Sequence, residues 1–198
     1  MSTPTREQVR AEIAEWLADA WDPDIGLAEW RERLVASGWA VPSWSREWYG
    51  RGLPAWADTI VSEQLRAVGA VGTPLGAGMS LAAPTLYTHA SDELKHQFLR
   101  PTLTGELTWC QLFSEPSAGS DLAGMKATAV LDGDEWVVNG QKVWNTSAHH
   151  ADLGMLVVRT NWDVRKLHGI SYFVLPMRQT GIEVQPILHM NLRESYNE

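Results

Sequence analysis

The residues best suited to chemistry form one short polar segment, Gln111 to Asp121, which reads Gln-Leu-Phe-Ser-Glu-Pro-Ser-Ala-Gly-Ser-Asp. A strand-like run enters it, and Pro116 and Gly119 then turn the chain. Serine hydroxyls and backbone N–H groups in such a turn can converge on an anion or on the polar edge of a ring. The same residues also suit a plain capped turn, in which Ser114, Ser117 and Asp121 bond to their own backbone. The segment matches neither the Walker phosphate loop nor the GxGxxG dinucleotide loop.

A second segment, Asn139 to Thr146, reads Asn-Gly-Gln-Lys-Val-Trp-Asn-Thr. Asn139 and Gly140 predict a turn, after which Trp144 and Thr146 would share one face of a strand, because strand side chains alternate. A ring and a hydroxyl on one face could stack on a flat heterocycle and bond to its edge. A tryptophan on a strand can equally be a core residue.

Three other groups of residues invite a chemical interpretation. His149 and His150 suggest a metal, but neighbours on a strand face opposite ways and no third ligand has suitable spacing, so no metal site is expected. Cys110 borders the first segment without the histidine or aspartate pattern of a nucleophile, so a buried small residue is predicted. Glu115 and Asp121 could be taken for an acid–base pair.

The elements that position these segments change type along the chain. Thr5 and Ser91 are predicted helix N-caps, and Pro54 suits a first helical position. Beyond Leu107 the apolar spacing changes, and Asp132-Gly133-Asp134 is a strong hairpin signal. The predicted helices run from Thr5 to before Pro23, over Leu27–Ser37, from Pro54 to about Val71, over Leu75–Thr88 and from Ser91 onward, with Pro101 and Gly105 closing the helical half. The predicted strands are Lys126–Leu131, Glu135–Val138, Met155–Arg159, Ile170–Leu175 and Ile182–Ile187.

Helices followed by strands indicate an α+β chain with a helical domain over residues 1–107 and a β-domain over 108–198. Hydrophobic residues make up 44% and charged residues 20%, as in ordinary globular proteins. The net charge of −8 argues against nucleic-acid binding. No apolar run is long enough to span a membrane. A single cysteine excludes an internal disulfide, and the N-terminus lacks a secretory signal, so a cytoplasmic location is expected.

The two polar segments, in this order and at this separation, resemble the acyl-CoA dehydrogenase family. The matching stretches are Ser114–Asp121 and Gly133–Trp144, and the helical half agrees through Gly38-Trp39 with Pro42 and through Ser91–Pro101. The resemblance covers the chain from about residue 5. It implies an N-terminal all-helical domain followed by a β-barrel-like middle domain, with the C-terminal helical domain absent. The chain is therefore expected to be a fragment of a longer enzyme.

The resemblance also implies which residues bind FAD. The first segment would lie along the isoalloxazine, and Gly119 and Ser120 near the pyrophosphate, with Ser120 also a candidate acyl-CoA contact. Trp144 would flank the flavin and Thr146 would bond near its N5 edge, with Asn145 between them. Glu115 and Asp121 would then hold the loop. The implied cofactor-binding set is Gln111, Leu112, Phe113, Ser114, Gly119, Ser120, Trp144, Asn145 and Thr146.

In the family, flavin oxidises the α,β-bond of an acyl-CoA thioester, and the electrons pass to an electron-transfer flavoprotein. The base is a glutamate of the C-terminal domain in most members, so no catalytic base is assigned here. A tetramer, homomeric or heteromeric, is implied for the full-length enzyme. Leu112-Phe113, Ser117 and Asn145 depart from the common pattern, which leaves flavin binding expected and chain-length preference open.

The sequence leaves three functions open. The leading one is FAD-dependent acyl-CoA dehydrogenation in fatty acid or steroid side-chain catabolism, since eleven tryptophans are compatible with a bulky ring or branched substrate. An acyl-CoA oxidase or flavin monooxygenase relative would keep FAD and change the chemistry. A non-catalytic or half-site subunit of a heteromeric dehydrogenase would leave the base to its partner.

Overall fold

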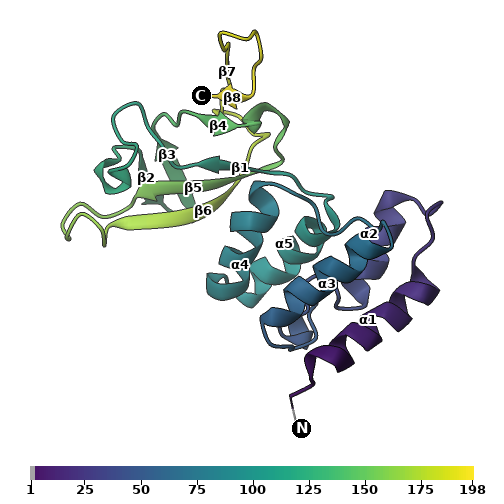
Figure 1. The fold of residues 1–198 in the computed structure, drawn as a ribbon. Coiled ribbons are helices and arrows are strands. Elements are labelled where there is room, and N and C mark those ends of the chain that lie inside the picture. The colour runs from purple at the N-terminus through teal and green to yellow at the C-terminus, as the bar shows by residue number, and fades with distance from the viewer. Residues whose placement is uncertain (1–2) are drawn as a thin grey trace. The chain divides into compact units, whose positions relative to one another are not determined.

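The computed structural model describes residues 3–198, which divide into two compact units, 3–107 and 108–198. The first unit contains helices and the second contains strands with short helical turns (Figure 1). The helices are α1 (Arg6–Ala20), α2 (Leu27–Ala36), α3 (Trp56–Ala67), α4 (Ala83–His89) and α5 (Asp92–Thr104), with a 3-10 turn at Arg46–Trp48 and a π-helical turn at Gly78–Ala82. None of the helices in residues 3–198 combines the length and apolar character needed to cross a bilayer.

Local capping explains where the long helices begin. Thr5 accepts from the backbone N–H of Gln8, and the Gln8 side chain accepts in return from the N–H of Thr5, which completes a capping box. Ser91 accepts from the Leu94 N–H and caps α5. Both predicted caps are confirmed.

The helical unit is built around a tryptophan. Trp30 of α2 is fully buried, and its indole N–H donates to the carbonyl of Val71 at 2.7 Å. Trp16 and Trp21 pack on its ring, with centroid distances of 5.6 and 4.7 Å. The core around it comprises Val9, Ile13, Leu17, Leu34, Trp39, Ala57, Ile60, Val61, Leu65 and Ala70. Much of the tryptophan-rich composition therefore serves packing, because each ring buries a large apolar area.

Several predicted helix boundaries are wrong. Pro54 does not occupy the first helical position, because α3 begins at Trp56 with Ala55 as its N-cap, and α3 ends at Ala67 and not near Val71. The helix expected over Leu75–Thr88 starts only at the π-helical turn Gly78–Ala82, and Leu75 is 99% exposed. Pro101 lies inside α5 and does not close it; α5 runs to Thr104, and Gly105, the other predicted closing residue, is its C-cap. The helix continues because Thr102 and Leu103 beyond the proline are buried, and packing outweighs the lost backbone bond.

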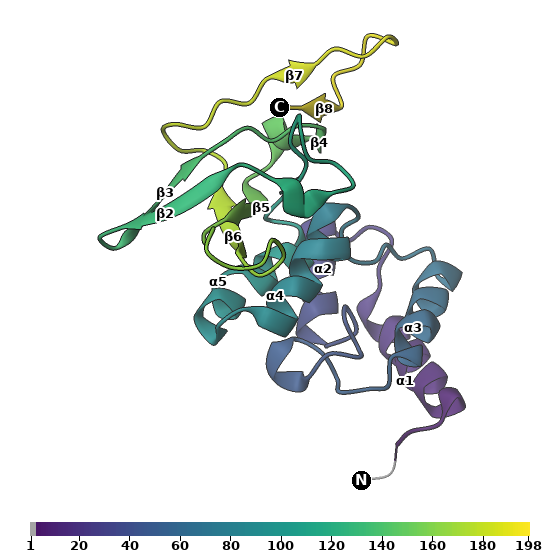
Figure 2. The same ribbon diagram turned by 90° about the vertical axis from the view of Figure 1, so that its left-hand side faces the viewer.

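The β-unit contains two sheets, shown in two views in Figures 1 and 2. The larger has the order β1 (Trp109–Leu112), β5 (Leu153–Arg159), β2 (Thr128–Asp132), β3 (Glu135–Asn139), with β6 (Ile170–Pro176) also paired to β5. The smaller has the order β4 (Asn145–Thr146), β8 (Tyr196–Asn197), β7 (Pro186–Ile187). β1 pairs with β5 in parallel, whereas β2–β3 and β5–β6 are antiparallel, so the sheet is mixed.

The sheet is not closed, so the barrel-like form expected for this half is wrong. β2 meets β5 only at the pair Thr128–Arg159 and then diverges with β3 as a hairpin. A barrel requires a continuous ladder around its circumference, and one bridging pair does not provide it. The hairpin itself is confirmed: β2 ends at Asp132, β3 begins at Glu135, and Gly133 turns the chain at φ 62°.

The core of the β-unit lies around β5, whose seven residues are all buried. A strand buried on both faces needs apolar side chains throughout, which Leu153 to Val158 supply apart from Gly154. The strand predicted over Ile182–Ile187 forms only at Pro186–Ile187. The packed residues here are Cys110, Leu112, Ala127, Ala129, Ala148, Ala151, Leu156, Val158 and Met177.

Candidate functional site

The two polar segments lie side by side in the β-unit. β1 leads into the first segment and contacts β4 of the second. The N–H of Val143 donates to the carbonyl of Ser114 at 2.9 Å, which links the segments backbone to backbone. Tertiary structure thus brings together residues about thirty positions apart in the chain.

A buried ion pair holds this junction. Glu115 is 7% exposed, and its carboxylate accepts from the N–H groups of Lys126 at 2.7 Å and Ala127 at 3.0 Å. The ammonium group of Lys142 donates to the same carboxylate at 2.9 Å and to the Phe113 carbonyl at 2.9 Å. Glu115 therefore holds the loop and is not exposed for acid–base chemistry.

The surroundings of Glu115 favour its charged form. Burial by itself raises the pKa of the Glu115 carboxyl, but the Lys126 N–H, the Lys142 ammonium and the Ala127 N–H together outweigh burial, so its pKa lies below the ordinary 4.5. Burial also lowers the pKa of Lys142, against the opposing effect of Glu115. A carboxylate with three donors remains ionised at neutral pH.

The bend after Glu115 leaves its hydroxyls free. Glu115 and Ala118 exchange backbone hydrogen bonds of 2.9 and 3.0 Å, so the turn is closed by main chain alone. Asp121 forms an ion pair with Lys166. Within residues 3–198, the side-chain hydroxyls of Ser114, Ser117 and Ser120 have no hydrogen-bond partner. The serine caps of a plain capped turn are therefore not formed.

Trp144 lies outside the strand on which it was predicted. Its backbone is left-handed at φ 63°, and β4 begins one residue later. Its side chain is 61% exposed and contacts Tyr196 edge to face, with ring centroids 6.2 Å apart. Gln111 and Thr146 are also exposed. A left-handed tryptophan is strained, and such strain in nonglycine residues is concentrated at functional sites.

Leu112 and Asn145 differ from these exposed neighbours because both are buried. They line a cavity of about 590 Å³, shared with Lys142, Leu156 and Met177. Asn145 is 3% exposed, and its side-chain oxygen has no hydrogen-bond partner within the described residues. Asn145 is therefore a buried lining residue of this cavity and not an exposed contact like Trp144.

The two adjacent histidines and the cysteine have structural surroundings. His149 and His150 lie on the 3-10 turn Ala148–His150, not on a strand, with rings 3.9 Å apart, and His149 bonds to Asn197 at 2.7 Å. Within residues 3–198, no three histidine, cysteine, aspartate or glutamate side chains lie close enough together to hold a metal ion. Burial raises the pKa of the Cys110 thiol to about 11, so it is not a thiolate nucleophile at neutral pH.

Sequence reasoning missed two buried cations. Lys142 was not linked to Glu115, 27 positions away. Arg159 is 3% exposed and donates to the carbonyls of Ala123 at 2.7 Å and Lys166 at 3.0 Å, which fixes the loops beside the first segment. A single cation at the end of the apolar run Leu153–Val158 was the available signal for Arg159.

Replacing Lys142 by alanine should strongly destabilise the β-unit. The change leaves the buried Glu115 charge without its cation, which costs about 3–5 kcal/mol. The matched control is Lys166→Ala, which removes the exposed partner of Asp121 and should cost at most about 1 kcal/mol. Urea unfolding of both variants measures the loss in unfolding free energy. Equal losses in the two variants would contradict a larger contribution from the buried pair.

The pair should also make stability depend on acid. Because the folded-state pKa of Glu115 is lowered, its stabilisation is complete above the unfolded pKa and is lost as the pH falls through the folded value. Wild-type unfolding free energy should therefore drop more steeply than that of Glu115→Gln as the pH falls below the ordinary carboxyl value of 4.5. Exposed Glu183→Gln should follow the wild type, and parallel curves for all three would contradict the assignment.

Both halves of the chain match known domain families. Residues 2–106 match the family model for the acyl-CoA dehydrogenase N-terminal domain, and residues 110–195 match the model for the middle domain. Among relatives, acyl-CoA dehydrogenase FadE34 of Mycobacterium tuberculosis is 38% identical over 98% of this chain and 26% of its own length. Acyl-CoA dehydrogenase IpdE1 of the same organism is 32% identical over 97% of this chain and 54% of its own length.

Solved structures with a similar fold also match the whole of this chain. The ChsE4–ChsE5 complex from Mycobacterium tuberculosis matches all of this chain and 53% of the matched chain, at 31% identity and a TM-score of 0.70. A structure described as PigA with FAD and proline matches all of this chain and 56% of its own, at 27% identity and a TM-score of 0.67. The chain spans at most about half the length of the relatives named here. By its two matched domains and its relatives, the chain belongs to the acyl-CoA dehydrogenase family.

Proposed function

We propose that this chain supplies flavin-binding residues of an FAD-dependent acyl-CoA dehydrogenase. The observation that carries the proposal is the junction of the two segments, where the Val143–Ser114 backbone bond sets exposed Trp144 and Thr146 near the serine-rich bend. An exposed indole and adjacent free hydroxyls suit a flat ring with a polar edge. Family membership favours FAD as that ring.

The available donors fit such a cofactor. Thr146 would bond near flavin N5, and Trp144 would flank the ring. Gln111, Phe113 and Ser114 would lie along its edge, with Leu112 and Asn145 beneath them. Gly119 and Ser120 would lie near the pyrophosphate, where Ser120 could also contact the acyl-CoA. A PigA structure that contains FAD has a similar fold, which supports this assignment.

The reaction we propose is α,β-dehydrogenation of an acyl-CoA thioester. When bound, FAD would supply the hydride acceptor for the β-carbon, and the α-proton would go to a base. In this chain the Thr146 hydroxyl would stabilise negative charge near N5, and the rigid Glu115–Lys142 pair would hold the bend in place. We assign no base among these 198 residues. An electron-transfer flavoprotein would take the electrons.

For the substrate we propose a bulky acyl-CoA from fatty acid or steroid side-chain catabolism. One similar structure is described as the Tcur3481–Tcur3483 steroid ACAD, at 25% identity over all of this chain and a TM-score of 0.69. Its name supports a steroid-type substrate here.

Removing the Trp144 ring should weaken FAD binding by about tenfold or more. Burying a large apolar side chain is worth about 1.5–3 kcal/mol, and about 1.4 kcal/mol corresponds to a tenfold change in affinity. Titration of the 198-residue chain with FAD, followed by flavin fluorescence, would compare wild type with Trp144→Ala. Trp162→Ala is the matched control because Trp162 is also exposed, at 62%. Equal affinity in wild type and Trp144→Ala would refute the stacking role.

A second candidate is a half-site subunit that completes its active site with a homologous partner. Two of the similar structures are named as pairs of proteins, ChsE4–ChsE5 and Tcur3481–Tcur3483, which favours this alternative. Affinity purification of the protein from its native cell should then recover a second acyl-CoA dehydrogenase polypeptide in equal amount. Recovery of only identical copies would favour a homomeric enzyme.

A further inference from the structure

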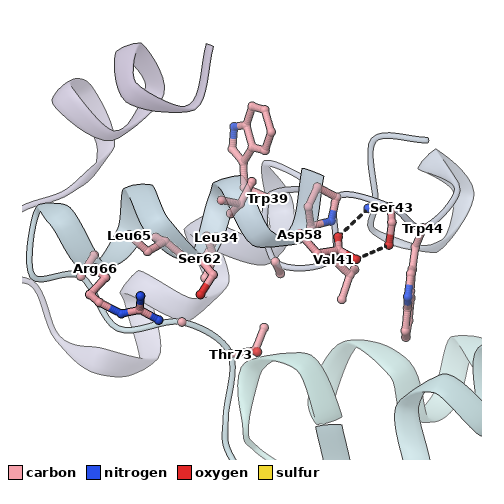
Figure 3. Close-up of a pocket in the computed structure, with 15 residues that line it drawn as sticks. Leu34, Trp39, Val41, Ser43, Trp44, Asp58, Ser62, Leu65, Arg66 and Thr73 are labelled. Carbon is pink, nitrogen blue, oxygen red and sulfur yellow. Dashed lines mark hydrogen bonds between the residues drawn. The ribbon is translucent and has the colours of Figure 1, made fainter. Parts of the chain in front are cut away.

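The helical unit contains a pocket of about 380 Å³ between α3, the loop from Trp39 to Trp44, and the loop from Ala70 to Thr73 (Figure 3). Its base is apolar and preformed: Leu34, Val61 and Leu65 are 1%, 3% and 7% exposed. The volume lies within the range of about 300–1,000 Å³ typical of small-molecule sites. All of the residues that line this pocket belong to the helical unit, residues 3–107. None of them belongs to the two segments of the proposed flavin site.

Polar groups line one wall of this pocket. Asp58, Ser62 and Arg66 follow one another at intervals of four on α3, so they share one helix face. Asp58 is already engaged, since it accepts from the N–H of Ser43 at 3.1 Å and from its hydroxyl at 2.8 Å, as the dashed lines in Figure 3 show.

Farther along α3 from Asp58, the pocket is lined by hydrogen-bond donors that have no partner. Within residues 3–198, the guanidinium of Arg66 and the hydroxyls of Ser62 and Thr73 have no hydrogen-bond or ion-pair partner. In Figure 3 the Arg66 and Ser62 side chains lie on the side of α3 toward Thr73. One cation and two hydroxyls therefore border an apolar hollow.

We propose that this pocket binds a free monocarboxylate with an apolar tail. The planar guanidinium fork of Arg66 matches a carboxylate in two parallel hydrogen bonds, and Ser62 and Thr73 can donate to the same oxygens. The tail would lie on Leu34, Val61 and Leu65. Arg66 is the single cation among the residues that line the pocket, so its charge suits one carboxylate.

A ligand titration of the 198-residue chain tests this proposal directly. Two-dimensional amide and indole NMR, with hexanoate as the probe, should show saturable shifts at the pocket residues, including the Trp39 and Trp44 indoles. Hexanol, which keeps the tail without the charge, should bind at least tenfold more weakly.

Three variants separate the charge from the cavity. Arg66→Gln should weaken hexanoate at least tenfold, whereas Arg46→Gln, at an exposed arginine outside the pocket, should leave it unchanged. Gly72→Leu should block binding by filling the pocket, since a Cβ there meets only Leu65 Cδ1 at 4.0 Å and the backbone is not left-handed. Chemical shifts elsewhere in each variant report whether it is folded.

The titrations with hexanoate and hexanol either support or overturn the carboxylate site. Saturable hexanoate binding that depends on Arg66 and is blocked at Gly72 supports the site. Absence of saturable shifts in the folded wild-type chain, equal binding of hexanol, or unchanged affinity in Arg66→Gln would each overturn it. None of these results depends on FAD, so the flavin assignment stands or falls separately.

Discussion

The β-unit depends on one buried ion pair. Glu115 follows the strand that enters the bend, and Lys142 precedes the exposed Trp144, so their contact joins the two segments that carry the proposed chemistry. The carboxylate also accepts two backbone N–H groups at the start of β2. Leaving either charge buried alone would be unfavourable, and the geometry is therefore held firmly. A rigid frame of this kind is what a positioned cofactor requires.

The frame satisfies its own polar groups and leaves a separate set free. Backbone bonds close the bend at Glu115 and Ala118, so its serine hydroxyls need no internal role. Trp144 is held exposed in a left-handed conformation, although a bulky apolar side chain would gain by burial. Buried satisfied groups beside exposed unsatisfied ones indicate a surface organised for a ligand. The side-chain oxygen of Asn145 is an exception, because it is buried and has no hydrogen-bond partner within the described residues.

The two units contribute in different ways. In the helical unit, a core of tryptophan and aliphatic residues supports a pocket with one unpaired arginine. In the β-unit, the open sheet places hairpin β2–β3 away from β5, with all of β3 exposed. Exposed apolar strand residues such as Val130 and Trp136 are unusual for an isolated unit. The relatives named above extend well beyond the matched length.

Sequence alone determined the features whose causes lie within a few residues. The Thr5 and Ser91 caps and the Asp132–Glu135 hairpin depend on local hydrogen bonds and on the φ of Gly133, and all three appear as predicted. The family, and with it the order of helices before strands, also followed from motif residues and their spacing. Only the tertiary structure decided that Lys142 meets Glu115, that Trp144 leaves its strand, and that the sheet stays open. These outcomes depend on contacts between distant residues, where burial and ion pairing outweigh local preference, and no short window of sequence contains both partners.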